Sequence, residues 1–142
     1  MKSPEELQAA RVAAAERFYA IGMSYLPEGW THAFRKSLSG LCWWDRKHID
    51  GPRPVTRKSL YIWLHECAHA HLHSGKELRR GKAKHVMEHE AEVWAHAKMR
   101  EHGIPVPRAM TTRAKEYVAR KIKQAEARGA KKIDAAARKF TK

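Results

Sequence analysis

The sequence has few of the features that mark secreted or membrane-spanning proteins. It contains only two cysteines, Cys42 and Cys67, which are not spaced as a Cys-x-x-Cys pair, so a disulfide-stabilised fold is excluded. It has no apolar run near the roughly 20 residues that cross a bilayer. The residues after Lys2 also lack the apolar segment of a signal peptide. We therefore expect a cytoplasmic protein with no membrane partner.

Acidic residues are also scarce. The chain has 15 Asp and Glu against 29 Lys and Arg, which gives a net charge of +14 with His neutral. Residues 104–142 hold 12 basic and 3 acidic residues, so this segment alone contributes +9. Such an excess indicates a polyanionic partner. The 43% of hydrophobic residues, five Trp among them, exclude a wholly disordered chain, and 142 residues suit one domain.

Capping and turn residues predict a mostly helical α+β fold. Four helices are expected, over residues 4–25, 56–74, 83–102 and from 111 or 112 to 129, and Asp134 is expected to cap one or two further turns. In the fourth of these helices, Tyr117 shares a face with alanine and β-branched residues, which is typical of core packing.

A small β-structure is expected before the second helix. Residues 30–49 predict a short hairpin with Ser39-Gly40 between its halves, and residues 50–54, which contain Gly51 and two prolines, predict a loop. We divide the chain into residues 1–103, which carry the candidate site, and residues 104–142, a basic helical extension packed on or appended to the first part.

The most specific motif is His65-Glu66-Cys67-Ala68-His69, which matches His-Glu-x-x-His. Residues four apart share one face of a helix, so His65 and His69 can both bind one zinc ion. Glu66 would lie at the flank, where it can accept a proton from zinc-bound water as a general base. A histidine-rich helix with hydrogen-bonded imidazoles and no metal is the simpler alternative.

A catalytic zinc needs a third protein ligand, and the next helix offers Glu88, Glu90 and Glu92. Glu88 and Glu92 share one face and Glu90 lies on nearly the opposite one, so periodicity does not choose between these two sets. His85-Val86-Met87-Glu88-His89 also matches the inverted zinc motif His-x-x-Glu-His, a competing assignment that we consider weaker.

Two elements of the sequence resemble the ImmA/IrrE-type family of zinc metallopeptidases. The family pattern H-E-x-x-H-x-x-L-H-x-G is matched from His65 to Gly75. Its second element, E-x-E-A-x-x-F-A, is matched from Glu88 to Ala95, with Trp94 in the aromatic position. The resemblance covers residues 38–105, and residues 39–43 show a weaker likeness to SprT-like proteases. Glu92 replaces a common asparagine, and the usual methionine-proline segment is absent.

The resemblance implies a mostly helical zincin-like domain whose third zinc ligand is Glu90, a gluzincin arrangement. It also implies cleavage of a protein substrate, often a DNA-associated regulator, by an enzyme whose gene is frequently carried on phage or mobile elements. Neither the residues nor the resemblance identifies the group that would stabilise the oxyanion. His71, Tyr61 and Arg35 are candidates.

The basic C-terminal helix suggests a second hypothesis, association with DNA. Residues that could contact phosphates are Arg113, Lys115, Arg120, Lys121, Lys123 and Arg128. A solvated helix with a solubilising charge excess would have the same composition. The alternative to a peptidase is therefore a basic nucleic-acid- or protein-binding module, in which any zinc is structural or vestigial.

Overall fold

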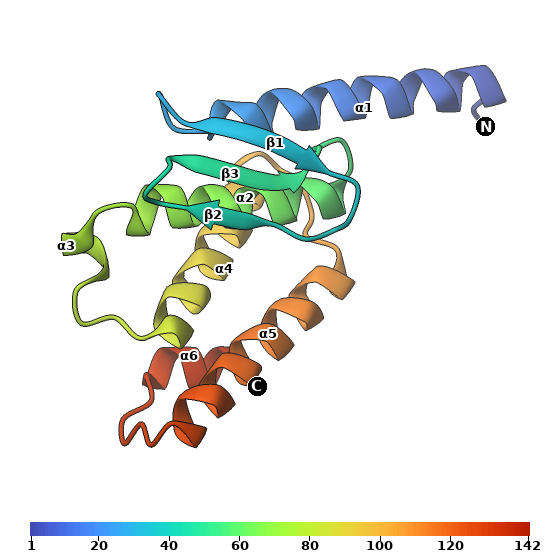
Figure 1. The fold of residues 1–142 in the computed structure, drawn as a ribbon. Helices are drawn as coiled ribbons and strands as arrows, with labels where there is room; N and C mark the ends of the chain where they lie inside the picture. Colours follow the sequence, from blue (N-terminus) through green and yellow to red (C-terminus); the bar gives the residue numbers. More distant parts are fainter.

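The computed structural model describes all 142 residues and has the predicted α+β class, with a small sheet that precedes most of the helices (Figure 1). The first element is helix α1, Pro4–Ser24, which Ser3 and Glu6 begin with a reciprocal capping box. Its N-terminal half extends beyond the rest of the molecule. The predicted first helix is confirmed.

The sheet contains three strands, β1 (Thr31–Arg35), β2 (Leu41–Trp43) and β3 (His48–Pro52), in the order β1-β3-β2. The predicted hairpin around Ser39-Gly40 is wrong, because β1 and β2 do not pair. β3 pairs in parallel with β1 and antiparallel with β2. The predicted loop at 50–54 is wrong for its first three residues, since β3 continues to Pro52, a strand end where a missing N–H is tolerated.

Helix α2, Arg57–His73, carries the His-Glu-x-x-His motif through the centre of the molecule. Thr56 caps it as predicted, and Ser59 completes a reciprocal capping box that was not predicted. On one side of α2, Trp63 packs against Ile49 of β3. On another side, Leu60 and Leu64 pack against helix α4, Lys84–Glu101. Because both sides of α2 are covered, its polar motif residues are held inside the protein.

The C-terminal segment consists of α5, Arg108–Ala127, and α6, Ala135–Phe140. α5 begins directly after Pro107, a few residues before the expected start, and Asp134 caps α6 as predicted. Val118 and Ile122 of α5 pack with Ala137 of α6, and Met110 joins the main core. The short helix α3, Lys76–Arg79, was not predicted. None of the helices has the length and apolar character that a membrane span needs.

Candidate metal centre

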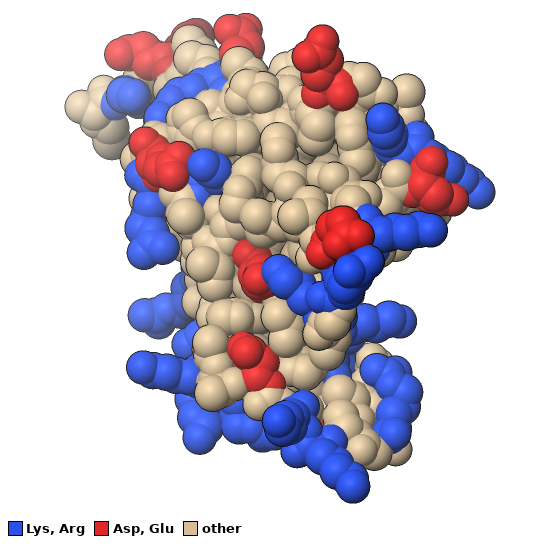
Figure 2. Space-filling view, turned by 90° about the vertical axis from the view of Figure 1, so that its left-hand side faces the viewer, with Lys and Arg blue, Asp and Glu red and all other residues tan.

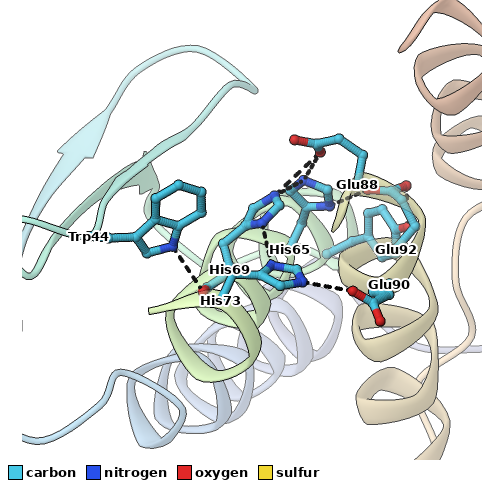
Figure 3. A network of polar contacts seen from close by, with 8 residues as sticks. Trp44, His65, His69, His73, Glu88, Glu90 and Glu92 are labelled. Carbon is cyan, nitrogen blue, oxygen red and sulfur yellow. Dashed lines mark hydrogen bonds and ion pairs between the residues drawn. The ribbon is translucent and has the colours of Figure 1, made fainter. Parts of the chain in front are cut away.

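The motif histidines of α2 meet a carboxylate from α4 (Figure 3). The Nε2 atoms of His65 and His69 lie 3.2 Å apart, and Glu88 Oε2 lies 3.1 Å from the first and 3.3 Å from the second. All three side chains are largely shielded from solvent, with exposed fractions of 11%, 8% and 17%. The structure therefore contains a buried His65–His69–Glu88 group that could bind a metal ion.

The spacing of these three atoms suits a divalent ion. Zinc binds imidazole nitrogen and carboxylate oxygen at about 2.0–2.2 Å, so neighbouring ligand atoms of a tetrahedral site lie about 3.3 Å apart. The three observed separations, 3.1 to 3.3 Å, are close to that value. Two imidazoles and one carboxylate are also the ligand set of a catalytic zinc site that leaves one position open. The residues present thus fit zinc.

The other ring nitrogens of the two histidines have buried partners. His65 Nδ1 is in close contact with a carboxylate oxygen of Glu92, whose second oxygen accepts a 2.7 Å hydrogen bond from the Tyr61 hydroxyl. His69 Nδ1 lies 3.0 Å from His73 Nδ1, and His73 Nε2 lies 3.0 Å from Glu90 Oε1. Such partners orient a metal-binding imidazole and select the tautomer that leaves Nε2 free.

The family resemblance assigned Glu90 as the third zinc ligand, but in the structure its carboxylate lies beside His73 and outside the three-residue group. Its carboxylate contacts buried His73 and accepts two 2.9 Å hydrogen bonds from Lys82. Glu88 and Glu92, four residues apart, both reach His65, while Glu90 points to His73, further along α2 (Figure 3). The carboxylate that completes the three-residue group is Glu88.

The buried carboxylates differ in their pKa. Burial alone would raise the pKa of Glu88, but hydrogen bonds from His65 and His69 outweigh it and hold that pKa below its ordinary value. Burial raises the pKa of Glu66, and the two histidines offset the rise only in part. Glu88 is therefore an anion suited to a cation, whereas Glu66 binds a proton more readily than an ordinary glutamate does.

Glu66 lies in the cleft beside the three-residue group without joining it. The cleft has two adjoining lobes, of about 190 and 180 Å³, and Glu66 lines both of them. Next to Glu66 is Gly40, the residue directly before β2, where a β-carbon would lie 2.9 Å from Glu66 Oε2. The edge of the sheet thus forms one wall of the cleft.

Helix α5 forms the opposite wall, which the sequence did not predict. Tyr117 lines both lobes, and its ring stands edge-on to the His65 ring with centroids 6.4 Å apart. Arg113 lines one lobe and donates a 2.6 Å hydrogen bond to the Leu38 carbonyl. Burial raises the pKa of Tyr117 to about 12, so its hydroxyl stays protonated at neutral pH. In the sequence, the only sign that Tyr117 could line a cleft was its hydroxyl on a helix face of mostly aliphatic residues.

The six basic residues predicted to contact DNA differ in their surroundings. Arg113 faces the cleft, and Arg120 and Lys121 lie 5.3 Å from the Tyr117 ring. Lys123 and Arg128 are exposed, and Lys115 donates to the carbonyl of Lys142. Lys and Arg gather on the lower part of one face, at the end where α5 and α6 lie (Figure 2).

The inverted motif on α4 contributes only Glu88 to the three-residue group. His85 Nε2 accepts a hydrogen bond from the backbone of Asp134, and the His89 ring lies 4.9 Å from the Phe140 ring. These histidines attach α4 to the C-terminal segment. The competing assignment of His85 and His89 as a metal pair therefore has no support from their positions.

Comparison with known proteins found no relative of this chain. No family model, no curated protein and no solved structure matches the chain. The interpretation of the site consequently depends on its own geometry.

Proposed function

We propose that the protein is a zinc-dependent metallopeptidase of the ImmA/IrrE-like type, in which His65, His69 and Glu88 hold the metal. The observation that carries this proposal is the pairing of the three-residue group with a separate, buried glutamate, Glu66, in the same cleft. A site that only stabilised the fold would be closed by a fourth ligand and would not need such a glutamate.

The chain's own residues would divide the chemistry of hydrolysis. A zinc ion held by the three ligands would polarise the scissile carbonyl and lower the pKa of water. Glu66 would take a proton from the attacking water and pass it to the nitrogen of the leaving amine.

The sheet suggests how a protein substrate would bind. β2 is an edge strand, and Gly40, Leu41 and Cys42 line the lobe that contains the metal group. An extended peptide could add to this edge through backbone hydrogen bonds, which places a peptide bond between Glu66 and the metal ligands. The proposed substrate is therefore an unfolded or loop segment of a protein.

Three variants test the peptidase proposal. We expect zinc-loaded Glu66→Gln to keep its zinc and to lose hydrolysis of a labelled, denatured casein by at least about 100-fold, because it loses the proton acceptor and no ligand. His65→Ala should lose both zinc and hydrolysis. Glu116→Gln, an exposed change of the same kind, is the control that should preserve both. Hydrolysis by pure Glu66→Gln at the wild-type rate would refute the proposal.

A second proposed function, association with DNA, is favoured by the basic end of the molecule. A protein that neutralises phosphates binds duplex DNA with an affinity that falls steeply between 50 and 200 mM salt. Fluorescence anisotropy with a labelled duplex would measure this slope. We expect Lys123→Glu with Arg128→Glu to weaken binding, and Lys2→Glu, at the far end of α1, to leave it unchanged. Absence of binding at 50 mM salt would refute the association.

A further inference from the structure

Four residues are shared by both lobes of the cleft, and they mark the point where the lobes join. These residues are Gly40, His65, Glu66 and Tyr117. In the proposed peptidase, His65 binds the metal, Glu66 moves the proton, and Gly40 belongs to the strand edge that would hold the substrate. A peptide that runs through both lobes would have its scissile bond at this junction, beside Tyr117.

Several other polar groups of the protein are engaged elsewhere, and Arg113, which lines only one lobe, donates to the Leu38 carbonyl. The Tyr61 hydroxyl donates to Glu92, and Trp44 Nε1 donates to the carbonyl of His69. Of the remaining candidates for stabilising an oxyanion, Arg35 pairs with Asp50, and His71 lies 2.7 Å from the carbonyl of Tyr25 and stacks on Trp94. The Tyr61 hydroxyl, Trp44 Nε1 and His71 Nε2 thus each donate within the protein, and Arg35 is paired with Asp50 and does not line either lobe.

The Tyr117 hydroxyl, in contrast, has no hydrogen-bond partner in the protein. The ring stands edge-on to His65, and the cations of Arg120 and Lys121 each lie 5.3 Å from its centroid. Val118 and Ala114, its neighbours on α5, are buried, which anchors this part of the helix. A side chain held in this way presents its hydroxyl with little further loss of freedom.

We propose that the Tyr117 hydroxyl hydrogen-bonds the carbonyl oxygen of the scissile peptide bond and stabilises the negative charge that develops on it. This inference rests on the proposed peptidase function and adds a catalytic residue to it. As the oxygen of water bonds to the carbonyl carbon, electron density moves to the carbonyl oxygen, to which the Tyr117 hydroxyl would donate its hydrogen bond. When the carbon–nitrogen bond breaks, that charge returns to the carbonyl and Glu66 delivers its proton to the amine. Tyr117 keeps its own proton throughout.

The kinetic test compares zinc-loaded wild type with Tyr117→Phe and with Tyr19→Phe, a control whose ring packs on Phe34 of β1, the edge strand opposite β2. Loss of one oxyanion donor costs about 100- to 1,000-fold in kcat in other hydrolases. We expect a fall of about 100-fold in kcat for Tyr117→Phe, with KM, zinc content and Tm unchanged. A kcat within threefold of wild type would overturn the inference.

A binding test separates this inference from the function on which it rests. A phosphinic peptide carries the tetrahedral, charged oxygens of the reacting carbonyl, and its affinity for zinc-loaded protein can be measured by calorimetry without turnover. We expect Tyr117→Phe to bind it at least about 10-fold more weakly than wild type or Tyr19→Phe. If wild type binds the probe but hydrolyses no peptide, the peptidase proposal is refuted. The difference in probe affinity between wild type and Tyr117→Phe would still decide whether Tyr117 binds the charged oxygen. Equal probe affinities of wild type and Tyr117→Phe, or no binding of the probe by wild type, would overturn the inference about Tyr117.

Discussion

Gly40 lies so close to Glu66 that a β-carbon on the glycine would stand 2.6 Å from Glu66 Cγ. The backbone carbonyl of Asp50, 3.0 Å from the same point, closes the other side. The glutamate therefore occupies its place in the cleft only because residue 40 has no side chain.

The first prediction is that Gly40→Ala displaces Glu66 without disturbing the metal ligands. We expect hydrolysis to fall at least about 10-fold while zinc content stays near wild type, because the three ligands lie on α2 and α4 and not on the strand. Gly75→Ala is the matched control, since its nearest neighbour would be 4.0 Å away. Full activity in Gly40→Ala would contradict the close packing of Glu66.

The second prediction distinguishes Glu88 from Glu90. Glu88→Gln should weaken zinc binding by at least about 100-fold, because it removes a ligand charge from the three-residue group, whereas Glu90→Gln should change it by about 10-fold at most, through His73. A competition titration with a chelating dye measures both. The reverse order of affinities would show that the resemblance, which assigned Glu90, was the better guide.

The third prediction concerns the partner of His65. Glu92→Gln replaces the carboxylate that holds His65 Nδ1, and loss of such an outer partner typically costs about 10- to 100-fold in metal affinity. Tyr61→Phe removes only the hydrogen bond to Glu92 and should have a smaller effect of the same sign. The same dye titration applies, and unchanged zinc affinity in Glu92→Gln would mean that packing alone orients His65.

The fourth prediction concerns Cys42, whose pKa burial raises from 9.0 to about 12. Because the thiolate is the reactive form, Ellman's reagent at pH 8 should modify the native protein at least about 10-fold more slowly than the urea-unfolded protein. The folded state keeps the proton that the unfolded state releases near pH 9. Stability from this group is therefore full below pH 9 and is lost as the pH rises toward 12. Rapid labelling of native Cys42 at pH 8 would contradict the raised pKa.

The fifth prediction is structural and concerns Gly22 in α1. An alanine at an open helix position stabilises by about 1 kcal/mol relative to glycine. At Gly22, however, the β-carbon would lie 2.7 Å from Pro54 Cγ and 3.1 Å from the Trp63 ring. We expect Gly22→Ala to lower the free energy of unfolding by about 1–3 kcal/mol in urea titrations. A gain in stability would show that Pro54 moves aside freely.

Local signals in the sequence predicted the helices well. Ser3, Thr56 and Asp134 each begin a helix as expected, because a capping side chain satisfies backbone N–H groups within three residues and needs no distant partner. The His65–His69 pair follows from the same local rule, since helical periodicity alone places residues four apart on one face. The sheet order was not predictable in this way, because the parallel pairing of β1 with β3 joins segments separated by a whole strand.

The sequence by itself determined the capped helices, the imidazole pair at positions 65 and 69, and the neighbouring acid at 66, all of which depend on spacing within one helix. Only the tertiary structure decided that Glu88 completes the group, that Glu90 contacts His73 and Lys82, and that Tyr117 closes the cleft. These outcomes depend on how α4 and α5 are rotated against α2. That rotation is set by the packing of Met99, Ala95 and Met110 against α2, which no spacing within a single helix encodes.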